Sequence, residues 1–312
     1  MLSEVPDGDA IDKAVDRLLL KADAYNRWPT PVSDLIAAAG LVEPKHSMLS
    51  NLILEQAPAH LQSAIRKLKR GGRLRALLDR KEREVHIDPD ITQKGREAFH
   101  KLHEVSHDIY AWQRELAYAD DDATLAPSMR KIFEWQANQG AAELLFQRGQ
   151  FATMARQYST EMASVVELSR NVGASIHATF RRFVEVSQST VAGVVMDVSP
   201  HTRVPLSYTR HEIVFSNSWK EHFGGISGWP RDLREQPYSF VTLADTARSS
   251  GSAVRGAFTL PDLRNESVVL DVELYCNRFS IFALIWIPRR ERLRKKLIIV
   301  SQPVRASTTS AN

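Results

Sequence analysis

Hydrophobic residues change their spacing once along the chain, near residue 190. Before this point apolar side chains recur every three or four positions, as in Ile11, Val15 and Leu18, which predicts amphipathic helices. After it, β-branched and alternating runs such as 191–198 and 268–274 are separated by turn residues, which predicts strands. A helical half that precedes a β-rich half, without alternating strands and helices, predicts an α+β fold.

The length of 312 residues corresponds to two or three domains at about 150 residues each. We expect a helical N-terminal region (1–70), a mostly helical central domain (71–190), a β-rich C-terminal domain (191–305) and a disordered, Ser/Thr-rich tail (306–312). The stretch 49–78 is expected to be helical, with breaks at its proline and at a pair of glycines.

The single cysteine, Cys276, limits both the compartment and the metal chemistry. One thiol excludes an internal disulfide framework and a Cys-rich zinc finger, and it agrees with a reducing cytoplasm. Any zinc site must therefore use nitrogen and oxygen ligands. The acidic N-terminus has no export signal, and the most apolar run, 279–288, is far shorter than the roughly 20 residues of a membrane-spanning helix. We therefore expect a cytoplasmic protein with no membrane partner.

The net charge of +4 is too small to indicate a nucleic-acid-binding protein, but two local runs are strongly basic. The first extends from Arg66 to Arg83 and the second from Arg289 to Lys296. We interpret the first run as a solvated surface, with a contact to nucleic acid as the alternative.

The sequence His103-Glu104-Val105-Ser106-His107 carries the clearest chemical signal. It lies in a stretch with helical periodicity and no proline, 92–116. Side chains four positions apart share one face of a helix, so both imidazoles can bind the same metal ion. Glu104 projects toward the open side of that ion, where a carboxylate can accept a proton from water. A catalytic zinc also needs a third protein ligand, and Glu134 on the next predicted helix, 127–146, is the candidate.

These residues resemble the ImmA/IrrE family of metallopeptidases. That family shows a short strand, a helix with His-Glu-x-x-His, and a helix that reads Glu-x-x-Ala-Asn-x-Phe-Ala-x-x-Leu-Leu. Here the strand is 85–88, and the second helix matches at Glu134, Ala137, Asn138, Ala141, Leu144 and Leu145. The resemblance covers about residues 75–190. It departs at Gly140, which replaces the usual phenylalanine and predicts a looser packing contact, and at Val105-Ser106, which replaces the usual Leu-Gly pair.

The resemblance implies that residues 71–190 form a zincin-like metallopeptidase domain. His103, His107 and Glu134 would bind Zn²⁺, with Mn²⁺ as the alternative ion, and Glu104 would act as the general base. The implied reaction is metal-assisted hydrolysis of a peptide bond, in which Glu104 passes the proton of the attacking water to the leaving amine. The family also suggests a protein substrate, a helix-turn-helix transcriptional repressor, and a sensory role for residues 191–305.

A second hypothesis belongs to another class, a DNA-binding transcriptional regulator. Residues 163–186 have the spacing of a helix-turn-helix, and Arg181 and Arg182 on the second helix can face DNA. Against this, the same helix has apolar residues at core spacing, namely Ile176, Phe180 and Phe183. A third hypothesis, a binding module with a structural metal, requires a fourth protein ligand that the sequence does not identify.

Residues that assist the metal centre are less well defined by the sequence. Asp108 can accept a hydrogen bond from a ligand imidazole, although a solvated helix carboxylate is the simpler interpretation. The oxyanion of the reaction needs a hydrogen-bond donor, for which the sequence offers Tyr110, Arg114, Tyr158 and His177 without distinguishing among them.

Overall fold

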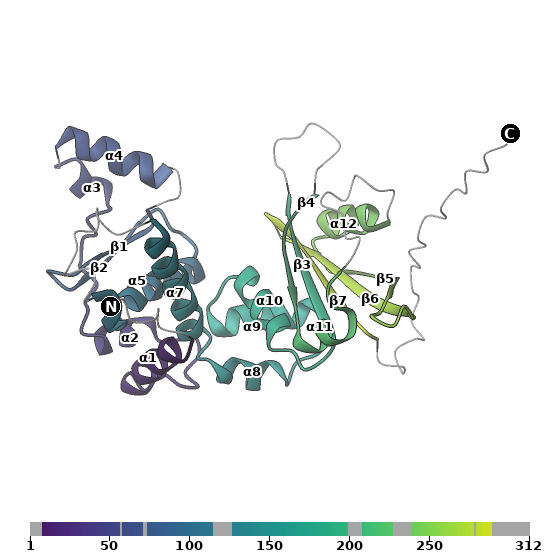
Figure 1. Ribbon diagram of the computed structural model, residues 1–312. Coiled ribbons are helices and arrows are strands. Elements are labelled where there is room, and N and C mark those ends of the chain that lie inside the picture. Colours follow the sequence, from purple (N-terminus) through teal and green to yellow (C-terminus); the bar gives the residue numbers. More distant parts are fainter. Residues whose placement is uncertain are drawn as a thin grey trace. The chain divides into compact units, whose positions relative to one another are not determined.

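The computed structural model describes residues 8–56, 58–70, 74–114, 127–198, 208–226, 239–277 and 279–288 (Figure 1). It has the predicted α+β fold. The chain divides into two compact units, Met1–Thr153 with Ser169–Ser175, and Met154–Leu168 with Ile176–Asn312. The predicted tail 306–312 and the basic run 289–296 lie outside the described residues. In the described part of the chain, no helix is both long enough and apolar enough to cross a bilayer.

The first unit contains the N-terminal helices and the predicted metal ligands. Its helices are α1 (Gly8–Lys21), α2 (Val32–Ala38), α3 (Asn51–Leu54), α4 (Ala59–Arg70), α5 (Lys94–Ile109), α7 (Pro127–Leu145) and the start of α8 (Gly149–Ala155). β1 (Ala76–Asp79) and β2 (Glu84–Ile87) pair antiparallel, and both contact α5. α1 contacts α7 and α2 contacts α5, so the N-terminal helices and the predicted metal ligands share one unit.

α5 and α7 pack along the small residues of α7. The buried ones are Ala137, Gly140 and Ala141, which let the two helix backbones approach closely. A Cβ atom at Gly140 would overlap the Tyr110 hydroxyl and lie 2.7 Å from Ser106 Oγ. Gly140 therefore makes room for two side chains in a close contact, and the looser packing predicted for this position is wrong.

The second unit is built on a five-stranded antiparallel sheet. Its strands are β3 (Val191–Val198), β4 (Tyr208–Phe215), β5 (Val254–Pro261), β6 (Ser267–Cys276) and β7 (Ser280–Trp286), in the order β4-β3-β7-β6-β5. α10 (Ile176–Glu185) and the start of α9 (Met162–Val172) cover one side (Figure 1). α11 (Asn217–Phe223) and α12 (Ser239–Ser250) cover the other side.

Both faces of the sheet are covered, which explains why most of the β3 sequence is apolar. Alternate residues of β3 join a core with α11 and α12, namely Ala192, Val194 and Met196. On the opposite face, a Cβ atom at Gly193 would lie 2.6 Å from the Phe180 ring of α10. Strands that are buried on both faces lose the hydrophobic–polar alternation of a half-exposed strand.

The boundary between the units lies earlier than the one expected near residue 190. At the start of α9, the Met162 backbone N–H donates to the Glu273 carboxylate of β6 at 2.5 Å. Arg255 of β5 donates to the same carboxylate at 3.0 Å. Phe180 of α10 packs against Phe282 of β7, with 5.3 Å between ring centroids. These contacts place α10 and the start of α9 with the sheet, although their spacing is helical like that of the first unit.

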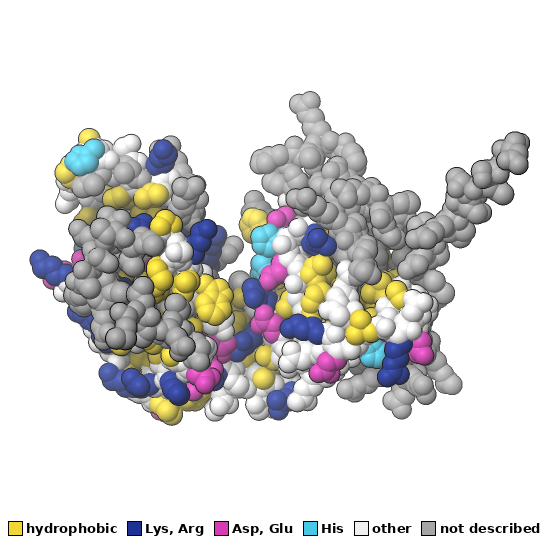
Figure 2. All heavy atoms as spheres, in the orientation of Figure 1, with side chains coloured by type: hydrophobic (Ala, Val, Ile, Leu, Met, Phe, Trp, Pro, Cys, Tyr) yellow, Lys and Arg dark blue, Asp and Glu magenta, His cyan; other side chains and the backbone are white. Residues whose placement is uncertain are grey.

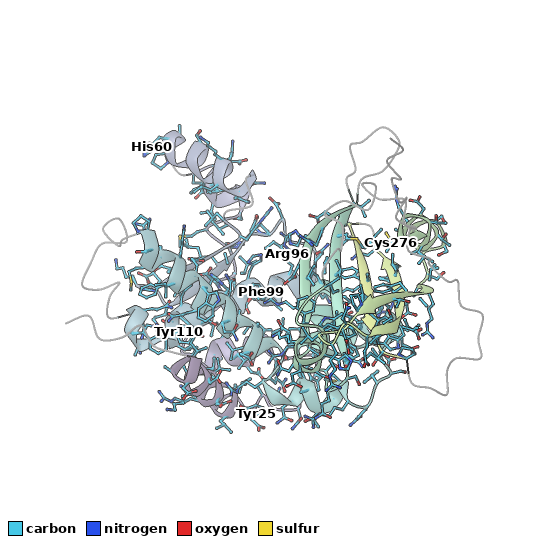
Figure 3. All side chains as sticks on the ribbon, turned by 45° about the vertical axis from the view of Figure 1, so that its right-hand side comes forward. Tyr25, His60, Arg96, Phe99, Tyr110 and Cys276 are labelled. Atoms are coloured by element: carbon cyan, nitrogen blue, oxygen red, sulfur yellow. The ribbon has the colours of Figure 1, made fainter. Side chains whose placement is uncertain are left out.

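Two local elements differ from the sequence expectation. Residues 76–78, expected to be helical, form β1 together with Asp79, and this strand pairs with β2 residue by residue. The helix expected over 92–116 ends at Ile109, because Tyr110 adopts an extended conformation with φ −83° and ψ 101°. Tyr110, labelled in Figure 3, is fully buried, and its hydroxyl donates to the Gln136 carbonyl oxygen of α7. Tertiary packing thus overrides the helical spacing at this position.

Candidate metal centre

The three predicted metal ligands meet between α5 and α7. The Nε2 atoms of His103 and His107 are 3.2 Å apart. Glu134 places one carboxylate oxygen 3.3 Å from His103 Nε2 and the other 3.6 Å from His107 Nε2. Ligand atoms at about 2.0–2.2 Å from a tetrahedral zinc are separated by roughly 3.4 Å, and each imidazole lies at about this distance from one oxygen of Glu134. With one ligand atom from each residue, the three atoms lie within 4.8 Å of one another. The structure brings together all three residues predicted from the sequence.

Gln113 sets the orientation of the His107 ring. Its Oε1 lies 2.7 Å from His107 Nδ1, and its Nε2 donates to Gln136 Oε1 at 2.9 Å. Because the amide nitrogen donates to Gln136, the amide oxygen accepts, and His107 Nδ1 carries the hydrogen. In the neutral ring, the form that can bind a metal ion, the lone pair of His107 is then on Nε2, the atom that faces the other two predicted ligands. Gln113 and Gln136 are both buried, which fixes this arrangement.

His103 has a corresponding partner on α7. Its Nδ1 lies 3.1 Å from Oδ1 of Asn138, which follows Glu134 by one helical turn. Asn138 belongs to the family pattern of the second helix. Gln113, in contrast, is a site residue that the sequence reasoning missed, because it follows the break at Tyr110 and has no regular spacing to the histidines.

Glu104 lies beside the ligands and faces the Leu78 backbone N–H of β1. Burial raises the pKa of its carboxyl, an effect that the neighbouring His107 and His103 oppose. Glu134 shows the opposite shift, because hydrogen bonds from His103 and His107 hold its pKa well below the usual range. The two carboxyl groups therefore suit different roles. Glu104 is suited to exchange a proton, and Glu134 is suited to bind a metal ion as an anion.

A pocket of about 650 Å³ reaches the centre. It is lined by Leu77, Leu78, Asp79, Arg80, Glu104, His107, Gln113, Arg130, Phe133 and Glu134. Three of these are consecutive residues of β1, as expected where a strand presents its edge. Among the described residues β1 pairs with β2 alone, so its second edge has no strand partner there. Glu104, His107 and Glu134 thus line a pocket beside an edge strand.

The other assisting residues considered from the sequence have different partners. Asp108 is buried and accepts hydrogen bonds from both terminal nitrogens of Arg83, at 2.5 and 2.9 Å. It is therefore neither an acceptor for an imidazole nor a solvated carboxylate, and both expectations were wrong. Three candidate oxyanion donors are engaged elsewhere, Tyr110 with Gln136, Tyr158 with Glu167 and His177 with Glu212, while Arg114 is exposed.

The helix pair 163–186 packs through the face that core spacing predicted. The buried residues of α10 include Phe180, Phe183 and Val184. Arg181 bonds Glu185 of the same helix at 2.8 Å and Glu212 of β4 at 3.0 Å. α10 therefore contacts the sheet with its apolar face, and one of the two arginines considered for DNA contact is held by carboxylates.

Much of the basic run 66–83 makes contacts within the protein. Lys69 is buried and bonds the Asp88 carboxylate at 2.8 Å, and Arg75 bonds the same carboxylate at 3.0 Å. Arg66 and Lys67 instead line a small pocket on α4, the helix that carries His60 in Figure 3. In the space-filling view, α4 shows a histidine near one end and a basic side chain near the other (Figure 2). The solvated surface expected for the whole run is thus limited to part of it.

Comparisons with known proteins bear on the fold. No protein-family model matches this chain, and no curated protein matches it. Among solved structures, it is similar to one described as a Mycobacterium tuberculosis transcriptional regulator, with a TM-score of 0.51 and 11% sequence identity. The match covers 89% of this chain and 76% of that chain. At this level of identity the likeness shows a shared α+β fold.

Proposed function

We propose that the protein is a zinc-dependent endopeptidase that cleaves a regulatory protein. The proposal is carried by one observation, the 3.2–3.6 Å spacing of the ligand atoms of His103, His107 and Glu134. Among the described residues this group offers three ligand side chains, which leaves a fourth position for water or substrate. A structural zinc is normally closed by a fourth protein ligand, so the arrangement favours catalysis over a purely structural metal.

In the proposed reaction, different residues of the chain have different roles. A zinc ion at such a site supplies Lewis acidity and lowers the pKa of water. Asn138 and Gln113 accept hydrogen bonds from the Nδ1 atoms of the two histidines and keep both Nε2 lone pairs directed at the centre. Glu104 accepts the proton of the attacking water and returns it to the leaving amine. Its burial, which raises the carboxyl pKa, favours this exchange in both directions.

The edge of β1 supports an extended polypeptide as the substrate. An extended segment can add to an edge strand through main-chain hydrogen bonds. Leu77, Leu78 and Asp79 line the pocket beside Glu104, so a segment added there passes close to the ligands. That the substrate is a helix-turn-helix repressor, and that the protein acts in the cytoplasm, are further parts of the proposal. They rest on the family resemblance and on the single cysteine.

Metal content and a base variant test this proposal together. We expect the purified protein to hold one zinc ion per chain by elemental analysis, and His103→Ala to lose it. Glu104→Gln should keep the zinc, capture a partner from a lysate, and cleave that partner about 100-fold or more slowly than the wild type. The captured protein should be a helix-turn-helix repressor. Protein without stoichiometric zinc, or a Glu104→Gln variant of wild-type speed, would contradict the proposal.

A DNA-binding transcriptional regulator is the second candidate, and the description of the structural neighbour favours it. Because α10 meets the sheet with its apolar face, Arg66 and Lys67 on α4 are better placed for DNA than Arg181. A salt-sensitive complex with duplex DNA would favour this function if Arg66→Glu with Lys67→Glu abolished it while Glu104→Gln left it intact.

A further inference from the structure

One buried carboxylate joins α4 to the hairpin of β1 and β2. Asp88, which directly follows β2, is fully buried. One of its carboxylate oxygens lies 2.8 Å from Nζ of Lys69 on α4, and the other lies 3.0 Å from a guanidinium nitrogen of Arg75, which directly precedes β1. The Asp88 backbone N–H also donates to the Arg75 carbonyl oxygen at 2.9 Å. Asp88 therefore holds the end of a helix and the start of a strand at the same point.

Lys69 attaches the end of α4 to the rest of the first unit. Its side chain is buried, donates to the Leu49 carbonyl oxygen at 2.8 Å and lies 3.3 Å from the Asp90 carboxylate. Of the side chains that the structure describes on α4, Lys69 alone forms ion pairs. Leu68 of the same helix is 41% exposed, and α4 forms no extensive contact with another described helix or strand. The ion pairs of one buried lysine thus fix the end of α4 against the hairpin.

The register of the hairpin shows which main-chain groups of β1 are free. Backbone hydrogen bonds alternate along an antiparallel pair, and the Arg75 carbonyl is directed toward the strand of β2. The main-chain groups of Leu77 therefore also face β2, whereas those of Ala76 and Leu78 face away from it. The Leu78 N–H accordingly faces Glu104. The free edge of β1 is thus the edge beside the proposed general base.

We infer that α4 controls the proposed site, because Lys69 and Asp88 hold Arg75, and with it the free edge of β1, in the position that binds an extended substrate. The inference rests on the proposed endopeptidase function and adds a control element to its site. The three residues are positioning residues, since none of them lines the pocket. Displacement of α4 breaks the bond from Lys69 and leaves the start of β1 less firmly held.

The charges of this contact depend on one another. Burial raises the pKa of Asp88, but hydrogen bonds from Lys69 and Arg75 outweigh burial and hold this pKa below its ordinary range. The carboxylate is therefore ionised at neutral pH. Removal of Lys69 leaves a buried charge with one cationic partner instead of two, which is unfavourable in a protein interior. β1 has four residues and pairs with β2 alone among the described strands, so this hairpin can open locally in response.

Hydrogen exchange tests the coupling between α4 and β1 directly. Lys69→Met removes the charge and keeps a side chain of similar length. In the full-length protein loaded with Zn²⁺, we expect the amides of 74–79 to exchange about tenfold faster, while those of 134–145 on α7 keep wild-type rates. Lys69→Arg, which keeps the charge, should restore protection. Lys94→Met is the control, because Lys94 of α5 is exposed and forms no ion pair among the described residues.

Peptide kinetics test the consequence for the site. For peptides of about six residues, long enough to pair with an edge strand, Lys69→Met should raise KM about tenfold and change kcat little. Zinc affinity should stay at the wild-type value, because the predicted ligands lie on α5 and α7. A general loss of stability would instead weaken zinc binding and speed exchange in α7 as well. Lys94→Met should leave KM unchanged.

The outcomes separate this inference from the function on which it rests. Wild-type exchange at 74–79 in Lys69→Met, or an unchanged KM, would overturn the control by α4. Faster exchange of β1 in a protein that cleaves no peptide contradicts the endopeptidase alone, and cleavage with unchanged exchange contradicts the control by α4 alone. If Lys69→Met melts early, the double variant with Asp88→Asn removes both buried charges, and the faster exchange at 74–79 must still appear.

Discussion

In the proposed zinc site, metal affinity should depend on the acceptors behind the two imidazoles. Gln113 accepts from His107 Nδ1 at 2.7 Å and is itself held by Gln136. Gln113→Ala keeps all three ligands but frees the His107 ring to rotate and to carry its hydrogen on Nε2. We therefore expect the zinc dissociation constant to rise about 10- to 100-fold, measured by competition with a chelating indicator.

The matched control for this prediction is Gln139→Ala. Gln139 also lies on α7 near the centre, but its amide donates to Glu143 and to no ligand. Its replacement should change zinc affinity little. Wild-type affinity in Gln113→Ala would show that the His107 ring keeps its orientation through packing alone.

At the level of single residues, the sequence predicts which three side chains meet better than it predicts the partners of those side chains. His103 and His107 are recognisable because a helix fixes the relation between positions four apart. Glu134 follows from the helix that comes next along the chain. Gln113 lies close to the same centre through the fold of the chain after Tyr110, and no regular spacing connects it with the histidines. Its role becomes visible only once α5 and α7 are packed together.

The close contact between α5 and α7 determines how near Glu134 lies to the two imidazoles. Gly140→Ala places a methyl group where the Tyr110 hydroxyl and Ser106 Oγ now lie. Overpacking of this kind costs about 1–3 kcal/mol, against a gain of about 1 kcal/mol from the better helix propensity of alanine. We expect a lower free energy of unfolding in urea, together with weaker zinc binding as the helices move apart.

Two variants check that the loss comes from the overlap. Gly149→Ala is the control, because no atom lies within 4 Å of a Cβ built at that glycine. Tyr110→Phe removes the overlapping hydroxyl, so the double variant with Gly140→Ala should lose less stability than the two single losses added together. Strictly additive losses would place the cause outside this contact.

Element types follow from the sequence where the helical spacing of apolar residues is regular, as in α1, or where β-branched residues form an apolar run, as in β3. Predictions of element type are wrong where a short apolar stretch can form either a helix or a strand. Residues 76–79 read Ala-Leu-Leu-Asp, too short to show a period, and they become a strand only because β2 lies beside them. The helix predicted through Tyr110 is wrong for a related reason. The buried hydrogen bond of Tyr110 to Gln136 of α7 outweighs the local preference for helix.

At the scale of the whole molecule, the two units do not divide where the hydrophobic spacing changes. α10 and the start of α9 are helical in pattern, yet they cover one face of the sheet. The hydrogen bond from Met162 to Glu273 joins residues 111 positions apart, a relation that no local pattern contains. The secondary structure changes from mostly helical to β-rich near residue 190, whereas the first compact unit gives way to the second near residue 153.

This difference predicts the behaviour of C-terminal fragments. A fragment that begins at residue 191 removes α9 and α10 and exposes the sheet face around Gly193, which includes the buried side chains Val195, Phe282 and Leu284. An apolar face of this kind promotes association of the isolated sheet. A fragment that begins at residue 154 keeps the covering helices, and we expect it to be monomeric and to unfold cooperatively on heating. The shorter fragment should aggregate or bind a hydrophobic dye. A monomeric, cooperatively folded 191–312 fragment would show instead that α10 and the start of α9 are dispensable for the sheet, and that its uncovered face is stable in water.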